Sequence, residues 1–221
     1  MKFALTEESL EDNLYEDLGA EYSKALARAM QETKEIFAAN ILNNGFTNSA
    51  PYYGGDGVPL FATNHPLWYG GTLSNALATP ADLSESALED LLIQIRTAVD
   101  DRGIPVMLKP LRVVIPPQLI YTAQRILKST LRTGTPDNDL NAINSLGVFG
   151  EPAHVMTRLT DPNAWFVKTD CDLGMQFFQR TAIQRKQFQD DDTNNYVYLA
   201  RERWSFGFTN PRSLFGSSGS S

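Results

Sequence analysis

The sequence predicts an α+β fold, with long helices in its earlier part and long strands at its end. Three observations support this prediction. Apolar residues recur every three or four positions over residues 20–43, which is the pattern of a long amphipathic helix. The run Leu111–Ile115 is apolar except at Arg112, as in a strand buried on both faces. Residues 175–188 and 195–208 are strand-like segments joined by a turn rich in Asp, Thr and Asn.

The first predicted elements are a short helix and a much longer one. Thr6 is a suitable N-cap for a helix over residues 6–15, because its side-chain oxygen can accept a backbone N–H of the first turn. Two glutamates in that turn also interact favourably with the helix dipole. The long helix over residues 20–43 spans about 35 Å. Gly45 is expected to adopt the left-handed conformation that ends many helices. Residues 45–80 show little periodicity, and a loop of this length indicates a functional or contact role.

The middle and end of the chain contain the remaining elements. A helix over residues 84–101 has Asp82 or Ser84 as its N-cap, and Gly103 stops it. A polar loop at 131–142 separates the middle from the closing strands, and the glycine- and serine-rich tail is expected to be mobile. The other predicted elements are the strand 111–115, a helix at 117–129, strand-like pieces at 147–159 and 164–169, and the two closing strands.

Composition excludes several classes of protein. The chain has 221 residues, 42% hydrophobic and 20% charged, which suits one domain or two small lobes with a real core. A single cysteine rules out a disulfide framework and a thiolate-rich zinc site. The net charge is −7, and the longest basic feature, residues 179–188, is followed at once by three aspartates, so sequence-specific nucleic-acid binding is disfavoured. Without a membrane-spanning run or a signal-peptide pattern, we expect a soluble cytosolic protein.

Neither histidine nor cysteine chemistry is indicated. His65 with Asp56 resembles a metal or general-base pair, but further ligands and a nucleophile are missing nearby. We therefore expect His65 to anchor a loop through hydrogen bonds. Cys171 lies between Asp170 and Asp172, whose charges raise the pKa of a thiol, so we expect an inert side chain. The sequence predicts no catalytic residue, no metal site and no cofactor.

Two further motifs also have structural interpretations. The glycine-rich residues 54–57 lack the following helix that a phosphate-binding loop requires, so these glycines are expected to allow turns with positive φ. Asp190–Asp192 are expected to form a solvated hairpin tip. The loop 52–69 is unusually aromatic, and such residues are typical anchors of protein–protein contacts. We predict that this loop contacts neighbouring subunits through Tyr52, Tyr53, Phe61, His65, Trp68 and Tyr69.

Several segments follow one another in a distinctive order and spacing: KALARAMQETKEIFAANILNNGF, DGVPLFATNHP, SNALATPADLSESALEDLL, DDRGIPVMLKPLRVVIPPQLIYTAQRILKS and WFVKTD. Together they resemble the major capsid (head) proteins of tailed phages, and are most similar to the branch that includes the Mu-like major head subunit. The resemblance covers the chain from about Leu14 to Gly216. It depends on several segments and on the ending NPRSLFGSSG, which makes it fairly specific.

The resemblance implies the Hong Kong 97-type capsid fold, in which a peripheral domain with a long spine helix and a β-hairpin joins a mixed α/β axial domain. Residues 1–80 would be the first part of the peripheral domain, with the end of an extended loop, the spine helix 20–43 and the glycine-rich loop. Residues 81–167 would be the axial domain. Residues 168–221 would complete the peripheral domain with the closing strands and a mobile tail.

The implied function is structural, and no enzymatic activity is expected. The protein would self-assemble into hexameric and pentameric capsomers of the icosahedral head that encloses phage double-stranded DNA. Arg132, Asp137 and Asn138, in the loop 130–145, would make contacts toward the capsomer axis. Scaffolding, portal and decoration proteins are possible further partners. Contact with packaged DNA would be weak and non-specific, membranes are not expected partners, and assembly would take place in the host bacterial cytoplasm.

Other interpretations stay open at this point. An encapsulin-like shell that stores an enzyme cargo shares the fold. A hydrolytic enzyme using His65 or Cys171 is a less favoured alternative, and a tail-tube subunit suits the long helix badly. One departure from the family pattern concerns the start of the chain. Only MKFALTEESLEDNLYEDLG precedes the spine helix, where relatives usually carry an arm and an extended loop that overlap neighbouring subunits.

Overall fold

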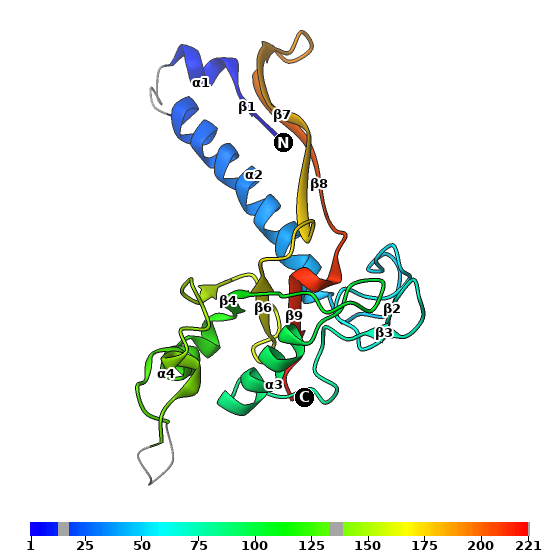
Figure 1. The fold of residues 1–221 in the computed structure, drawn as a ribbon. Coiled ribbons are helices and arrows are strands. Elements are labelled where there is room, and N and C mark those ends of the chain that lie inside the picture. Colours follow the sequence, from blue (N-terminus) through cyan, green and yellow to red (C-terminus); the bar gives the residue numbers. More distant parts are fainter. Residues whose placement is uncertain (13–17, 133–138, 221) are drawn as a thin grey trace. The chain divides into compact units, whose positions relative to one another are not determined.

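The structure is a computed structural model that describes residues 1–12, 18–132 and 139–220 (Figure 1). Contacts between residues divide the chain into two compact units. The first combines Met1–Ala38 with Phe177–Gly207, and the second combines Ala39–Gln176 with Phe208–Ser221. Among the described residues, no helix is long and apolar enough to cross a membrane.

The first unit pairs a long helix with a three-stranded sheet. Within the sheet the order is β1-β8-β7, and β1 is antiparallel to β8, from Lys2 opposite Leu199 to Leu5 opposite Tyr196. Side chains of the helix contact strand β8: the rings of Phe37 and Trp204 have centroids 5.3 Å apart. The elements are β1 Lys2–Leu5, α1 Glu7–Glu11, α2 Leu18–Asn43, whose last turns enter the second unit, β7 Met175–Gln189 and β8 Tyr196–Phe208.

The predicted long helix is confirmed as α2, which begins two residues earlier than expected. Its apolar stripe is only partly covered within the chain. Met30, Ala39 and Leu42 are buried, whereas Ile36 and Phe37 are 42% and 53% exposed. The predicted cap of the short helix is confirmed, because the Ser9 N–H donates to Thr6 Oγ1 over 3.3 Å.

The second unit is built around a four-stranded sheet of order β5-β4-β6-β9, in which β4 runs parallel to β5 and antiparallel to β6. A two-stranded sheet pairs β2 with β3. Its elements are β2 His65–Pro66, β3 Thr72–Leu73, α3 Glu85–Arg96, β4 Pro110–Ile115, η1 Pro117–Leu119, α4 Ile120–Lys128, α5 Ala142–Ser145, β5 His154–Val155, β6 Trp165–Thr169, η2 Pro211–Ser213 and β9 Leu214–Ser217.

Strand β4 is buried on both faces, as its sequence predicts. Val113 and Ile115 belong to the larger apolar cluster, which includes the buried face of α3, while Val114 belongs to a second cluster on the other face of the sheet. Phe166 on β6 lies in this second cluster and Trp165 in the first. Successive side chains of β4 point to opposite faces of the sheet, and both faces are apolar. Strand β4 therefore lies at the centre of this unit.

Helix α3 is shorter than predicted. Ser84 is its N-cap, accepting the Ala87 N–H over 3.2 Å, but the helix ends at Arg96 and does not reach residue 101. The following turn stops it, because Asp100 Oδ1 accepts the N–H groups of Arg102 and Ile104. The bond from Ile104 is the main reason why the pKa of Asp100 is lowered. Side-chain bonds of this kind compete with helical backbone bonds.

The C-terminal tail differs most from expectation. Its first residues are not mobile but form β9, paired with β6 from Trp165 opposite Ser217 to Lys168 opposite Leu214. Small residues are needed here: a Cβ added to Gly216 would lie 2.6 Å from the Phe166 ring. The Ser220 N–H then donates to Asp82 Oδ1 over 2.9 Å, and this bond is the main cause of the lowered pKa of Asp82. The glycine- and serine-rich composition here reflects close packing.

Two other local expectations are wrong. Gly45 does not adopt a positive φ; it is needed because an added Cβ would lie 2.6 Å from the ring of Phe61. The strand expected over residues 147–159 is reduced to the two residues of β5. Gly147, at φ 57°, lies in a turn before it.

Candidate functional site

A buried asparagine organises the long loop of the second unit. Asn75 is fully buried, and its Nδ2 donates to the carbonyl oxygens of Leu60, Pro211 and Leu214 over 2.7, 3.0 and 3.1 Å. Its Oδ1 accepts the Ala62 N–H over 2.9 Å. These partners fix the orientation of the amide. One side chain therefore joins the loop to the C-terminal segment, which is far away in sequence.

His65 extends this network, as the sequence predicts. Its ring is 2% exposed, with Nδ1 2.6 Å from Asp56 Oδ2 and Nε2 3.2 Å from Asn75 Oδ1. Because Asn75 Oδ1 can only accept, Nε2 must carry a proton. The histidine is thus an anchor of the loop. The side chain is buried inside the unit, so its contact with a neighbouring subunit stays a prediction.

The aromatic residues of the loop divide into exposed and buried groups. Trp68 and Tyr69 are 88% and 75% exposed, and Tyr52 and Tyr53 are partly exposed. Phe61 is buried instead, with ring centroids 4.8 Å from Phe46 and 4.9 Å from Phe166. Phe61 therefore belongs to the core and is not available as a contact residue.

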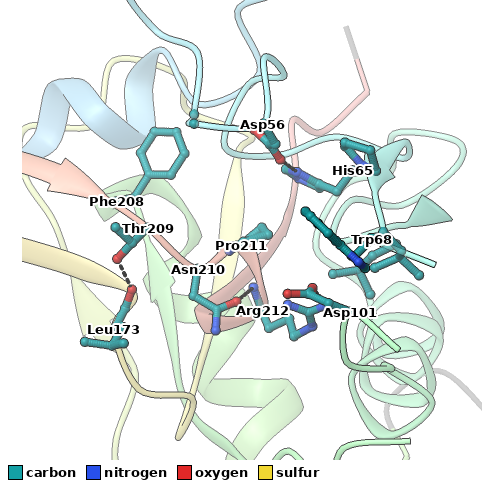
Figure 2. A pocket seen from close by; sticks show the side chains of 15 residues that line it. Asp56, His65, Trp68, Asp101, Leu173, Phe208, Thr209, Asn210, Pro211 and Arg212 are labelled. Carbon is teal, nitrogen blue, oxygen red and sulfur yellow. Dashed lines mark hydrogen bonds and ion pairs between the residues drawn. The ribbon is translucent and has the colours of Figure 1, made fainter. Parts of the chain in front are cut away.

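Next to Trp68 lies a cavity of about 570 Å³, formed by residues 54–56, 65–68, Asp101 and 208–212, with Leu73 and Leu173 (Figure 2). Figure 2 shows the Asp56–His65 pair toward one end and Arg212 with Asp101 toward the other. Arg212 Nε donates to the Val99 carbonyl over 2.6 Å, and Nη2 lies 2.7 Å from Asp101 Oδ1.

The lining residues of this cavity do not form a nucleophile–base pair. Its one lining hydroxyl, on Thr209, donates to the Leu173 carbonyl, and both nitrogens of His65 have partners already. A hydrolytic site needs a free nucleophile within hydrogen-bond reach of a base. Elsewhere in the described part of the chain, no three His, Cys, Asp or Glu side chains converge as metal ligands would.

A second exposed surface surrounds residues 131, 140 and 146. Leu131 and Leu140 form a bridge, and Leu140 and Leu146 are 65% and 73% exposed. Arg132, a predicted contact residue, has its Nε 3.3 Å from Glu85 Oε2 and is itself exposed. The other two predicted residues, Asp137 and Asn138, lie outside the described residues.

Residues 1–216 of the chain match the family model described as phage capsid protein. The chain belongs to this family. It is accordingly a structural shell protein. Among curated proteins, none is significantly similar to it in sequence.

Solved structures show the same fold at low sequence identity. The capsid of a native GTA particle is 12% identical, with a TM-score of 0.54, and 98% of this chain and 70% of that chain are covered. A structure from Mycobacterium phage Che8 is 13% identical, with a TM-score of 0.53 over 100% of this chain and 70% of that one. The holo-SrpI encapsulin complex from Synechococcus elongatus PCC 7942 is 10% identical, with a TM-score of 0.51 over 99% and 72%. The predicted Hong Kong 97-type fold is confirmed.

Cys171 has the inert environment expected in this capsid protein, although for a partly different reason. The pKa of its thiol is raised, and the largest cause is burial, with Asp172 and Asp170 adding to it and Arg212 opposing it. Its Sγ accepts from Asn210 Nδ2 over 3.2 Å. The thiolate is therefore disfavoured, unlike the thiolate of a reactive cysteine.

The key polar residues of the capsid protein were missed by sequence reasoning. Asn75, Arg212 and Asn141 are all buried, and each connects segments that are distant in sequence or caps a turn. Their neighbours in the sequence are unremarkable turn formers. Only Asn141 carried a usable signal, because an Asn before a short apolar helix is a common N-cap.

Proposed function

We propose that this capsid protein acts by self-association, with copies joining into hexameric and pentameric capsomers and then into the closed icosahedral head that holds phage double-stranded DNA. One observation carries the proposal: Trp68 and Tyr69 are exposed on a loop whose base is fixed by the buried Asn75–His65 network. A large aromatic side chain on a rigid support is the usual anchor of a protein interface.

Two physical effects favour association between copies: the aromatic side chains are held in place before binding, and each copy contacts several neighbours. An aromatic anchor that is held in place loses little conformational entropy on binding, so most of its burial energy contributes to association. A stable pairwise interface buries about 1,200–2,000 Å² in total. In a closed shell each copy has several neighbours, so that weaker individual contacts add up.

The test replaces the anchors with charge. Trp68→Asp/Tyr69→Asp should abolish particles in negative-stain electron microscopy and leave the circular dichroism spectrum unchanged, because both side chains are exposed in the single chain. The conservative variant Trp68→Phe/Tyr69→Phe keeps the aromatic surface and should still form particles. Normal particles from the aspartate variant would remove this loop from the proposal.

The second proposed contact is the surface around residues 130–145, directed toward the capsomer axis. It is supported by the exposed side chains of Leu140 and Leu146 and by the position of Arg132 beside them in the chain. The same proposal includes four further points. They are assembly in the host cytoplasm, partners such as scaffolding, portal and decoration proteins, membership of the Mu-like branch, and a division at residues 80 and 167 into peripheral and axial parts.

A second candidate function is an encapsulin-like shell around an enzyme cargo. It is favoured by the structural likeness to an encapsulin complex, which shows a shared fold. The two candidates differ in what the particles contain. Nuclease-protected DNA in purified particles supports the head protein, and a stoichiometric protein cargo without DNA supports the alternative.

A further inference from the structure

The two long strands of the first unit are strongly basic, although the whole chain has a net charge of −7. Strands β7 and β8 contain one acidic residue, Glu202, which is 5% exposed and 2.5 Å from Lys34 Nζ. All of their cationic side chains are exposed, and none has an ion-pair partner among the residues that the structure describes. They are Arg180, Arg185, Lys186, Arg201 and Arg203.

Part of this charge lies on the sheet face away from α2. Glu202 and Trp204 contact Lys34 and Phe37 of that helix. Successive side chains of a strand point to opposite faces, so Arg201 and Arg203 project from the other face, about 6.6 Å apart along the strand. We call residues 177–189 and 196–207 the hairpin shaft.

The turn between these strands has the opposite charge. Residues 190–194, here the hairpin tip, contain three aspartates, and Asp191 and Asp192 are exposed. The tip is closed by the Asp190 N–H bond to the Asn195 carbonyl over 2.9 Å, and Thr193 Oγ1 donates to Asp190 Oδ2. Asp190 lies opposite Asn195 at the base of the tip, and Arg201 is six residues further along β8, or about 20 Å of strand. An aspartate of the tip cannot reach Arg201 or Arg203 of its own shaft.

We propose that the acidic hairpin tip of one copy docks on the basic hairpin shaft of a neighbouring copy. This inference rests on the proposed function, since it requires copies to associate. The contact is heterologous: each copy offers both surfaces, so the same interaction repeats around a ring. Opposite charges on exposed surfaces mainly accelerate association and fix its orientation.

A second copy fits the shaft better than nucleic acid does. Large apolar side chains alternate with cations along β7, with Phe178 and Phe188 at 54% and 48% exposed. Exposed apolar groups beside cations suit a protein surface, whereas the phosphates of a duplex would leave them uncovered. The tip supplies carboxylates in the same chain, at the high local concentration of an assembling shell.

The experiment is a charge swap in the full chain, read by light scattering and electron microscopy at low salt. Asp191→Lys/Asp192→Lys and Arg201→Glu/Arg203→Glu should each slow particle formation at least about tenfold, because like charges then meet. Mixing the two variants, or combining all four changes in one chain, restores opposite charges and should restore the rate. Lys24→Glu/Arg28→Glu on α2 is the matched control and should assemble normally.

Each alternative outcome has a distinct meaning. If the wild type forms particles and the charge variants assemble at the same rate, this inference is wrong and the proposed function stays intact. The same holds if the charge swap fails to restore assembly. Wild-type protein that stays monomeric overturns both. If the shaft variant assembles normally but loses affinity for a 30-base-pair duplex, the shaft is a phosphate-binding surface and the proposed contact between copies is wrong.

Discussion

At the scale of single residues, buried amide groups hold the second unit together. Asn75 has five polar partners from two segments of the chain, residues 60–65 and 211–214, and each buried bond of this kind contributes about 1 kcal/mol. The residue is more important for the fold than any of the exposed aromatics, although the latter dominate the sequence of the loop.

Replacing this amide has a large expected effect. Asn75→Ala leaves several buried carbonyl groups without a donor and should lower the free energy of unfolding by about 3 kcal/mol, measured by urea denaturation. Asn48→Ala, at an exposed position of the same loop, is the control and should change it by about 0.5 kcal/mol or less. Equal effects of the two changes would contradict the role of Asn75 as the centre of the network.

At the scale of elements, strand β9 turns an apparent tail into part of the core. Phe215 is fully buried in the larger cluster, and Phe166 packs closely over Gly216. The sequence of this segment is short and is followed by serines and glycines. Its partner strand β6 lies about fifty residues earlier, so that no local pattern indicates the pairing.

The contribution of this strand can be measured. Phe215→Ala removes a fully buried ring, and we expect a loss of about 3–5 kcal/mol in the free energy of unfolding, followed by near-ultraviolet circular dichroism in urea. Met107→Ala changes a side chain that is 92% exposed and should leave stability nearly unchanged. A mobile tail would instead make both variants as stable as the wild type.

At the scale of the whole molecule, net charge limits what the shell holds tightly. Because the chain has a net charge of −7, its surface on average repels phosphate, and any contact with DNA is expected to be weak. In the proposed head, such a protein would enclose DNA without binding it tightly. In the proposed shell, association between copies would depend on the aromatic loop and on charge complementarity.

This balance predicts a salt-sensitive affinity. For a 30-base-pair duplex of random sequence we expect a dissociation constant of about 10⁻⁴ M or higher at physiological salt. The affinity should decrease further as the salt concentration increases. Fluorescence anisotropy at several salt concentrations measures it. Tight binding that does not respond to salt would show that DNA is recognised by something other than phosphate charge.

The sequence by itself determined the main elements of this capsid protein and its family. Helix α2, strand β4 and the β7–β8 hairpin were predictable because their periodicity is local, and the order of several segments indicated the fold. Tertiary structure alone decided which loop aromatics are exposed and which are core: Trp68 and Phe61 are both large aromatic residues, but only Phe61 meets Phe46 and Phe166. It also decided that Asn75 and β9 hold the second unit together. Their partners are distant along the chain, and burial depends on those partners, which no local pattern specifies.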